Sequence, residues 1–162
     1  MTHDTNLCLC GSLLNYAECC ELLHAGAVHA TSAESLMRSR FTAYAMHNAD
    51  YLLSSWDTET RPATVDFSND TGEWTCLEII ATKKGGAKDK KGIVEFKAYF
   101  TLDGEQRVMN EISRFVKKQN RWYYLDGKVK SINSTAGAFD QGLNAPCACG
   151  SGKKFKRCCG KK

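Results

Sequence analysis

The cysteines of this chain follow one spacing twice: Cys-x-Cys, then eight residues, then Cys-Cys. The eight residues are Cys8, Cys10, Cys19, Cys20, Cys147, Cys149, Cys158 and Cys159. Four thiolates supplied by a tight turn and a later dipeptide match the tetrahedral sulfur coordination that zinc takes in structural sites. The pattern therefore predicts two zinc ions, one near each end of a chain of 162 residues.

Disulfides are the main alternative for a chain with nine cysteines. They belong to oxidising compartments and use even counts, whereas this count is odd and the first residues do not resemble an export signal. Neighbouring cysteines also close only strained rings. Redox-active thiols are a second alternative. The ninth cysteine, Cys76, lies alone in an apolar stretch, where a small buried hydrophobic residue is expected.

The composition is that of a globular protein with one core domain. Hydrophobic residues make up 43% and charged residues 25% of the chain, which is ordinary for such a domain. The sequence has no basic leader followed by an apolar segment, and no run approaching the length of a membrane span. We therefore expect a cytoplasmic protein without a membrane span.

Positive charge is concentrated in the C-terminal tail. The net charge is +4, and residues 146–162 contain six basic residues and no acidic one. The first motif has Glu18 and Glu21 nearby and no Lys or Arg before position 34. Only the tail therefore suits an acidic partner such as nucleic acid or an acidic protein surface. The candidate docking residues are Lys153, Lys154, Lys156 and Arg157. A charge run that is only a solvated surface is the alternative.

Between the two motifs, helical patterns come first and strand patterns follow. Thr31-Ser-Ala-Glu34 resembles a capping box for a helix that ends near Asn48, and Asp50 can begin a second short helix. Segments rich in β-branched and aromatic residues follow at 74–82, 93–102, 108–116 and 122–126. This order predicts an α+β fold in which a curved antiparallel sheet packs on N-terminal helices.

Residues 147–160, CACGSGKKFKRCCG, resemble the SEC-C zinc motif, best known from the tail of the bacterial preprotein translocase ATPase. Two such motifs around a helix-then-sheet domain resemble the YchJ-like family. The segments 19–26, 36–44 and 121–127 strengthen that resemblance. It implies a cone-shaped middle domain of the nuclear-transport-factor-2-like, or cystatin-like, type. By analogy with the translocase tail, it implies a chaperone of secretory proteins, a translocase or the ribosome as partner.

The expected organisation has four parts: an N-terminal zinc module at 1–28, the nuclear-transport-factor-2-like domain at 29–130, a linker at 131–145 and a C-terminal zinc module at 146–162.

The first motif departs from the second in its surroundings. Leu13 stands where the second copy has Gly152, and an apolar run replaces the lysines. His24, four residues after Cys20, is an alternative fourth ligand, and the sequence leaves the choice between them open. Five residues form an apolar coat that we expect to be buried against the core: Leu13, Leu14, Tyr16, Leu22 and Leu23. The N-terminal zinc is thus expected to be structural, and the C-terminal zinc is expected to hold a docking module.

The middle domain also carries a candidate pocket. Arg40 and Tyr44 lie one helical turn apart on an apolar face. Glu111, Trp122 and Tyr124 lie in strand patterns and complete the candidate set. Each of these residues has an ordinary structural alternative, and fold analogy alone assigns no chemistry, so no residue is given a catalytic role.

These observations favour a zinc-binding interaction protein. A small-ligand-binding protein or enzyme using the cone, and a thiol-redox sensor, are the alternatives. Nucleic acid binding through the tail and a homodimer through the open sheet face also remain open.

Overall fold

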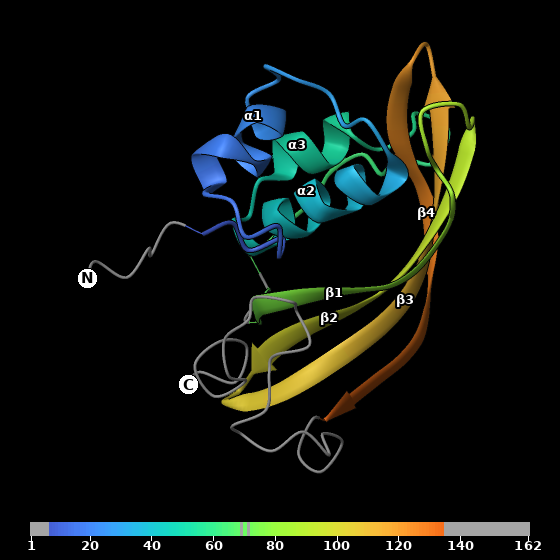
Figure 1. Ribbon diagram of the computed structural model, residues 1–162. Helices are drawn as coiled ribbons and strands as arrows, with labels where there is room; N and C mark the ends of the chain where they lie inside the picture. Colours follow the sequence, from blue (N-terminus) through green and yellow to red (C-terminus); the bar gives the residue numbers. More distant parts are fainter. Residues whose placement is uncertain (1–6, 69, 71, 135–162) are drawn as a thin grey trace.

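The computed structural model describes residues 7–68, 70 and 72–134, in which short helices precede one curved sheet (Figure 1). The helices are α1 (Cys20–His24), α2 (Ala33–Ala45) and α3 (Ala49–Ser54), preceded by the 3-10 turn η1 (Tyr16–Glu18). The strands are β1 (Glu73–Lys84), β2 (Lys91–Leu102), β3 (Glu105–Lys118) and β4 (Arg121–Ser134). Within the described residues, no helix combines the length and apolar character needed to cross a lipid bilayer.

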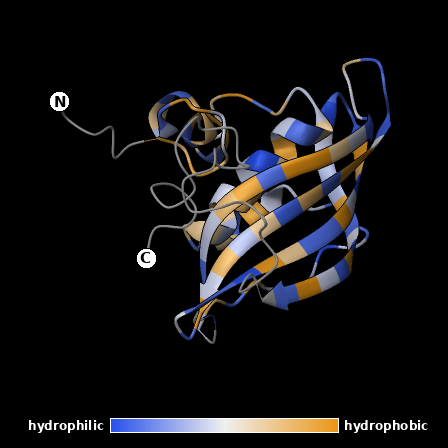
Figure 2. Cartoon of the chain, turned by 60° about the horizontal axis from the view of Figure 1, so that its bottom comes forward, coloured by the Kyte–Doolittle hydropathy of each residue, from blue (hydrophilic) through white to orange (hydrophobic). Residues whose placement is uncertain are grey.

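The sheet is an antiparallel meander in the order β1-β2-β3-β4, which confirms the predicted α+β class. Asp103 and Gly104 both have positive φ (53° and 76°), as do Gln119 and Asn120 (52° and 63°). Two such residues in succession form the tight turns whose twist matches antiparallel strands. Register shifts in β1 and in the β3–β4 pair add curvature. Hydrophobic and hydrophilic residues alternate along the strands (Figure 2), so the sheet has one apolar face.

Two helix starts and one strand end differ in detail from the sequence-based prediction. Ser32, not Thr31, caps α2, because its Oγ accepts the backbone N–H of Ser35 at 3.0 Å. Helix α3 begins after Asn48, whose Oδ1 accepts the N–H of Tyr51 at 3.1 Å. Strand β4 continues to Ser134, inside the range assigned to the linker, since β3 is long enough to pair with it along that length.

Helix α2 crosses the concave face of the sheet and forms the core with it (Figure 1). Its buried side chains Leu36, Met37 and Phe41 pack on apolar side chains from the strands. Those strand residues are Leu77, Val94, Phe96, Ala98, Phe115 and Trp122. Burial of this apolar area is the main favourable contribution to folding.

The first turn of α2 lies directly against the end of the β1–β2 hairpin. The N–H of Ala33 donates to the Gly85 carbonyl at 3.0 Å. A Cβ added at Gly92 would lie 2.7 Å from Gly85 Cα and 2.9 Å from Ala33 Cβ. Position 92 therefore has no room for a side chain unless backbone moves.

We expect Gly92→Ala to lower the free energy of unfolding by about 1–3 kcal/mol, because the methyl group would overpack this contact. Urea denaturation measures the change. Gly86→Ala is the matched control, since a Cβ there would meet only Asp89 Oδ2, at an ordinary 3.5 Å. Equal urea midpoints for the two variants would show that the close contact of Gly92 with Gly85 and Ala33 does not constrain the fold.

Candidate metal centre and interior cavity

Four sulfur atoms of the first motif gather into one cluster. The Sγ atoms of Cys8, Cys10, Cys19 and Cys20 all lie within 4.8 Å of one another. Cys19 Sγ lies 3.5 Å from Cys10 Sγ and 3.9 Å from Cys20 Sγ. A Zn–S bond of about 2.3 Å gives a tetrahedron edge of about 3.8 Å, whereas a disulfide needs about 2.05 Å. The four cysteines are unpaired and spaced as metal ligands are.

A tight turn and two short helical segments bring the sulfurs together. The N–H of Cys8 donates to the Leu14 carbonyl at 2.8 Å and closes the turn. Gly11 and Leu13 both have positive φ, at 83° and 68°, which reverses the chain between the ligand pairs. The segment η1 then leads into α1, which begins at Cys20.

The sulfurs are coupled electrostatically. Hydrogen bonds from Cys10 and Cys20 lower the pKa of Cys8. The contacts of Cys20 with Cys10 and Cys8, together with burial, raise its pKa. Ionisation of one sulfur therefore makes ionisation of its neighbour less favourable. A divalent cation removes this conflict, because it binds all four as thiolates.

The cysteine knuckle (residues 7–24) is fastened to α2 by polar contacts. Arg38 Nη1 donates to the Cys10 carbonyl, and Cys8 Sγ lies 3.7 Å from Thr42 Oγ1. The ring of His24 bridges the two parts: its Nδ1 lies 2.8 Å from the Tyr16 hydroxyl and its Nε2 lies 2.9 Å from the Ser39 carbonyl. Both ring nitrogens thus have partners, and Cys20, not His24, lies in the sulfur cluster.

The predicted apolar coat of the knuckle is only partly buried. Leu23 packs beside Tyr51 and Leu52, and Tyr16 packs on the sulfur cluster. Leu13 and Leu14, by contrast, are each 50% exposed, and Leu22 is also exposed. That expectation was wrong for these three leucines: Leu13 and Leu14 lie in the turn, and Leu22 lies on the exposed side of α1.

The second motif cannot be described in the same way. Its ligands and its basic residues lie outside the described residues: Cys147, Cys149, Cys158, Cys159, Lys153, Lys154, Lys156 and Arg157.

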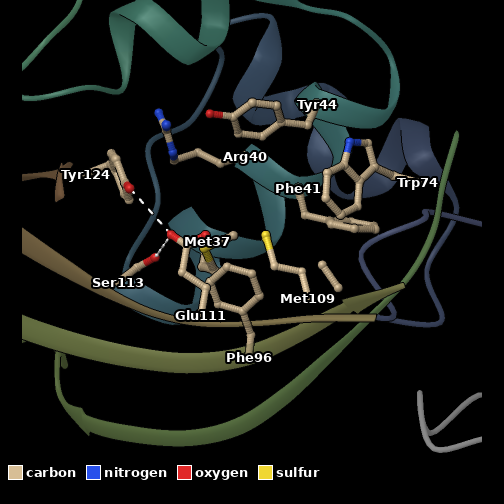
Figure 3. Close-up of a pocket in the computed structure, with 11 residues that line it drawn as sticks. Met37, Arg40, Phe41, Tyr44, Trp74, Phe96, Met109, Glu111, Ser113 and Tyr124 are labelled. Carbon is tan, nitrogen blue, oxygen red and sulfur yellow. Dashed lines mark hydrogen bonds between the residues drawn. The ribbon is translucent and has the colours of Figure 1, made fainter. Parts of the chain in front are cut away.

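A cavity of about 250 Å³ lies between α2 and the concave face of the sheet (Figure 3). Its lining is mainly apolar, with polar groups at one end. The lining residues are Met37, Arg40, Phe41, Tyr44, Trp74, Phe96, Ala98, Met109, Glu111, Ser113 and Tyr124. Four of the five candidate pocket residues are among them: Arg40, Tyr44, Glu111 and Tyr124.

Arg40 is the most buried charge of this cavity, at 1% exposure. Its Nη1 donates to the Leu52 carbonyl at 2.9 Å and to Ser55 Oγ at 2.7 Å. The guanidinium lies against three rings, at 4.3 Å from the centroid of Tyr124, 5.0 Å from that of Trp56 and 6.0 Å from that of Tyr44. Burial lowers its pKa, although the group stays charged because guanidinium is a very strong base.

Glu111 faces Arg40 from the sheet. Ser113 Oγ donates to Glu111 Oε1 at 2.9 Å, and the Tyr124 hydroxyl donates to the same oxygen at 3.5 Å (Figure 3). Burial nevertheless raises the pKa of this carboxyl. A Cβ added at Gly127 would lie 2.1 Å from Glu111 Oε1, so the glycine on β4 makes the space in which the carboxyl lies.

Trp122, the fifth candidate, belongs to the core instead of the cavity. It packs in the cluster that contains Ala33 and Leu36, beneath the first turns of α2, whereas the cavity lies beneath later turns. The sequence analysis missed Ser113, although its place two residues after Glu111 on one strand was a usable signal. It also missed Met37 and Phe41, which flank Arg40 at helical spacing.

A four-cysteine knuckle fastened to the helix of a curved α+β domain defines a class of small cysteine-knuckle proteins. The family models agree with this description, since "YchJ, middle NTF2-like domain" matches residues 32–127 and "SEC-C motif" matches residues 5–22 and 144–161. The chain therefore belongs to the YchJ family, whose curated members are called UPF0225 proteins.

Relatives cover the chain almost completely. The UPF0225 protein plu2503 of Photorhabdus laumondii is 43% identical, covering 96% of this chain and 99% of its own. A solution structure of RPA3114, a SEC-C motif containing protein from Rhodopseudomonas palustris, is 33% identical with a TM-score of 0.68, covering 76% of this chain and 98% of that one. A crystal structure of a SEC-C motif containing protein from Psychrobacter arcticus is 29% identical with a TM-score of 0.64. The match covers 99% of this chain and 98% of that one.

The contacts of His24 predict a bracing role that can be measured. His24→Ala should leave the zinc stoichiometry unchanged in native mass spectrometry, because the four sulfurs remain. Loss of its two hydrogen bonds, about 1 kcal/mol each, should speed hydrogen exchange in α1 by roughly tenfold or more. His29→Ala is the control, since His29 is exposed. Loss of one zinc ion in His24→Ala alone would instead make this histidine a ligand.

Proposed function

We propose that this chain is a cytoplasmic zinc-binding interaction protein. One zinc ion closes the N-terminal knuckle and braces it on α2, and a second holds the C-terminal motif, which docks on a larger assembly. The observation that carries the proposal is the sulfur cluster, whose 3.5 Å and 3.9 Å edges fit a zinc tetrahedron. A set of four sulfurs favours a structural role, because catalytic zinc keeps a position for water or substrate.

The environment of the N-terminal cluster supports its structural role. Cys8, Cys10 and Cys20 are buried, and their neighbours Thr42 and Arg38 belong to the core helix. The Arg38 guanidinium beside the cluster also offsets part of the negative charge that four thiolates and one zinc ion carry. Metal binding there would therefore join the knuckle to the folded domain.

The docking role of the second motif is supported by its sequence. A SEC-C match at residues 144–161 coincides with a tail of six basic residues and no acidic one. Such a tail suits an acidic partner, and its binding should weaken with salt. The ribosome, a chaperone of secretory proteins and a translocase are the candidate partners, of which the ribosome offers the densest negative charge.

Zinc stoichiometry tests the metal assignment. We expect two zinc ions per chain in native mass spectrometry of reduced protein, and one after Cys20→Ser, because three sulfurs bind the ion much less tightly. Ser12→Ala is the matched control, since Ser12 Oγ lies 3.2 Å from Cys19 Sγ without belonging to the sulfur set. Two ions retained by Cys20→Ser would contradict the N-terminal site.

Charge reversal tests the docking assignment. Changing Lys153, Lys154, Lys156 and Arg157 to Glu should reduce co-sedimentation with purified ribosomes at least tenfold at physiological salt. The control changes Lys84, Lys88, Lys90 and Lys91, all exposed around the β1–β2 hairpin, to Glu. Both sets of substitutions change the net charge equally. An equal loss of ribosome binding in both variants would therefore show that binding depends on net charge alone and not on the tail. Undiminished binding by the tail variant would overturn the proposal.

A further inference from the structure

We propose that the interior cavity binds a small organic acid, with the carboxylate of the ligand toward Arg40 and an apolar, ring-sized body at the opposite end. This site is independent of the zinc centres, and its ligand belongs to a different class of chemistry. The proposal depends on the shape of the cavity, the environment of Arg40 and the position of Glu111.

The cavity has two chemically distinct ends (Figure 3). Phe41, Trp74 and Met109 form an apolar end, and Met37 and Phe96 lie between it and the polar groups, beside Glu111. Polar groups form the other: Arg40, Tyr44, Glu111, Ser113 and Tyr124. Its volume of about 250 Å³ lies just below the range of about 300–1,000 Å³ for drug-sized ligands. An amphipathic molecule with one or two rings fits such a space, and a long acyl chain does not.

Arg40 supplies the charge that selects an acid. Among the ion pairs of the described residues, none involves Arg40. The two hydrogen bonds to α3 and its C-cap both use Nη1, and the guanidinium also interacts with the Tyr44 hydroxyl at the cavity. Glu111 interacts with Arg40 electrostatically without forming an ion pair, and a buried guanidinium without a directly paired carboxylate is costly. A ligand carboxylate can take the bidentate geometry that guanidinium offers and so supply the missing charge.

Glu111 decides how binding depends on pH. Burial raises the pKa of its carboxyl, and the groups that face it are Arg40 and Tyr44 on α2 and Tyr124 on β4, while β2 presents Phe96. An ionised Glu111 would repel a ligand carboxylate, whereas a protonated Glu111 can donate a hydrogen bond to it. Acid binding should therefore be accompanied by proton uptake and should weaken as the pH rises.

The test uses the full zinc-loaded chain and three probes that share one ring system: 1-naphthoate, 1-naphthamide and 1-naphthylmethylamine. Titrations followed by ¹H–¹⁵N NMR give both the affinity and the place of binding. We expect 1-naphthoate to bind at least tenfold more tightly than the neutral and cationic probes, with the largest shifts at the amides of Glu111 and Ser113. Affinity should fall as the pH rises, over a range in which the probe itself stays ionised.

Two variants connect the effect to the cavity. Glu111→Gln should tighten 1-naphthoate binding and flatten its pH dependence, which a merely structural role of Glu111 would not do. Ala98→Leu should fill the cavity and weaken binding at least tenfold, whereas Ala81→Leu, the same change at an exposed position of β1, should not. If Ala98→Leu fails to fold, the titration of Glu111→Gln with 1-naphthoate still shows whether the acid binds in the cavity.

Three results would overturn the proposal. The first is equal or tighter binding of the amide or the amine, which would mean that the polar end does not select a carboxylate. The second is a set of shifts confined to surface lysines, which would mean that 1-naphthoate binds elsewhere by charge alone. The third is the absence of any shift in cavity residues at millimolar 1-naphthoate.

Discussion

The packing of α2 against the concave face of the sheet is the contact on which both candidate sites depend. One side of the helix supplies Leu36, Met37 and Phe41 to the core, and the same side places Arg40 at the cavity. Another side meets the cysteine knuckle through Arg38 and Thr42. The helix is therefore enclosed on several sides, which explains why polar residues such as Ser39 and Thr42 are buried within it. Such a helix tolerates little displacement, because its interfaces would have to move together.

Arg38 and Arg40 lie two residues apart in α2 but have different environments and different roles. Arg38 is partly exposed and reaches the knuckle backbone, whereas Arg40 is enclosed by aromatic rings and the carbonyl of α3. A buried ionic group is seldom the most stable choice for a core, since apolar replacements of similar volume are often as stable or more so. The burial of Arg40 and the partial burial of Glu111 beside a cavity agree with the recognition role proposed for them.

The sequence predicted the features that depend on spacing and missed those that depend on packing. The cysteine spacing led to a cluster that the structure contains, because metal ligands near in sequence need little from the rest of the chain. The four strands and their antiparallel pairing followed from local composition in the same way. Trp122 was misplaced because residues on one face of a strand can meet different parts of the same helix. The exposure of Leu13 and Leu14 was missed because composition does not tell which way a turn points its side chains.

Leu13 shows how one cysteine spacing can have two different sets of intervening residues. Its backbone has a φ of 68°, a conformation that suits glycine, and the second motif has Gly152 at the equivalent position. A side chain in this region costs about 1–2 kcal/mol, so the turn needs compensating contacts. The knuckle has them in the Cys8–Leu14 hydrogen bond and in the contacts to α2. The cysteine spacing is thus the same in both motifs, while the residues between the cysteines can differ where surrounding contacts hold the turn in shape.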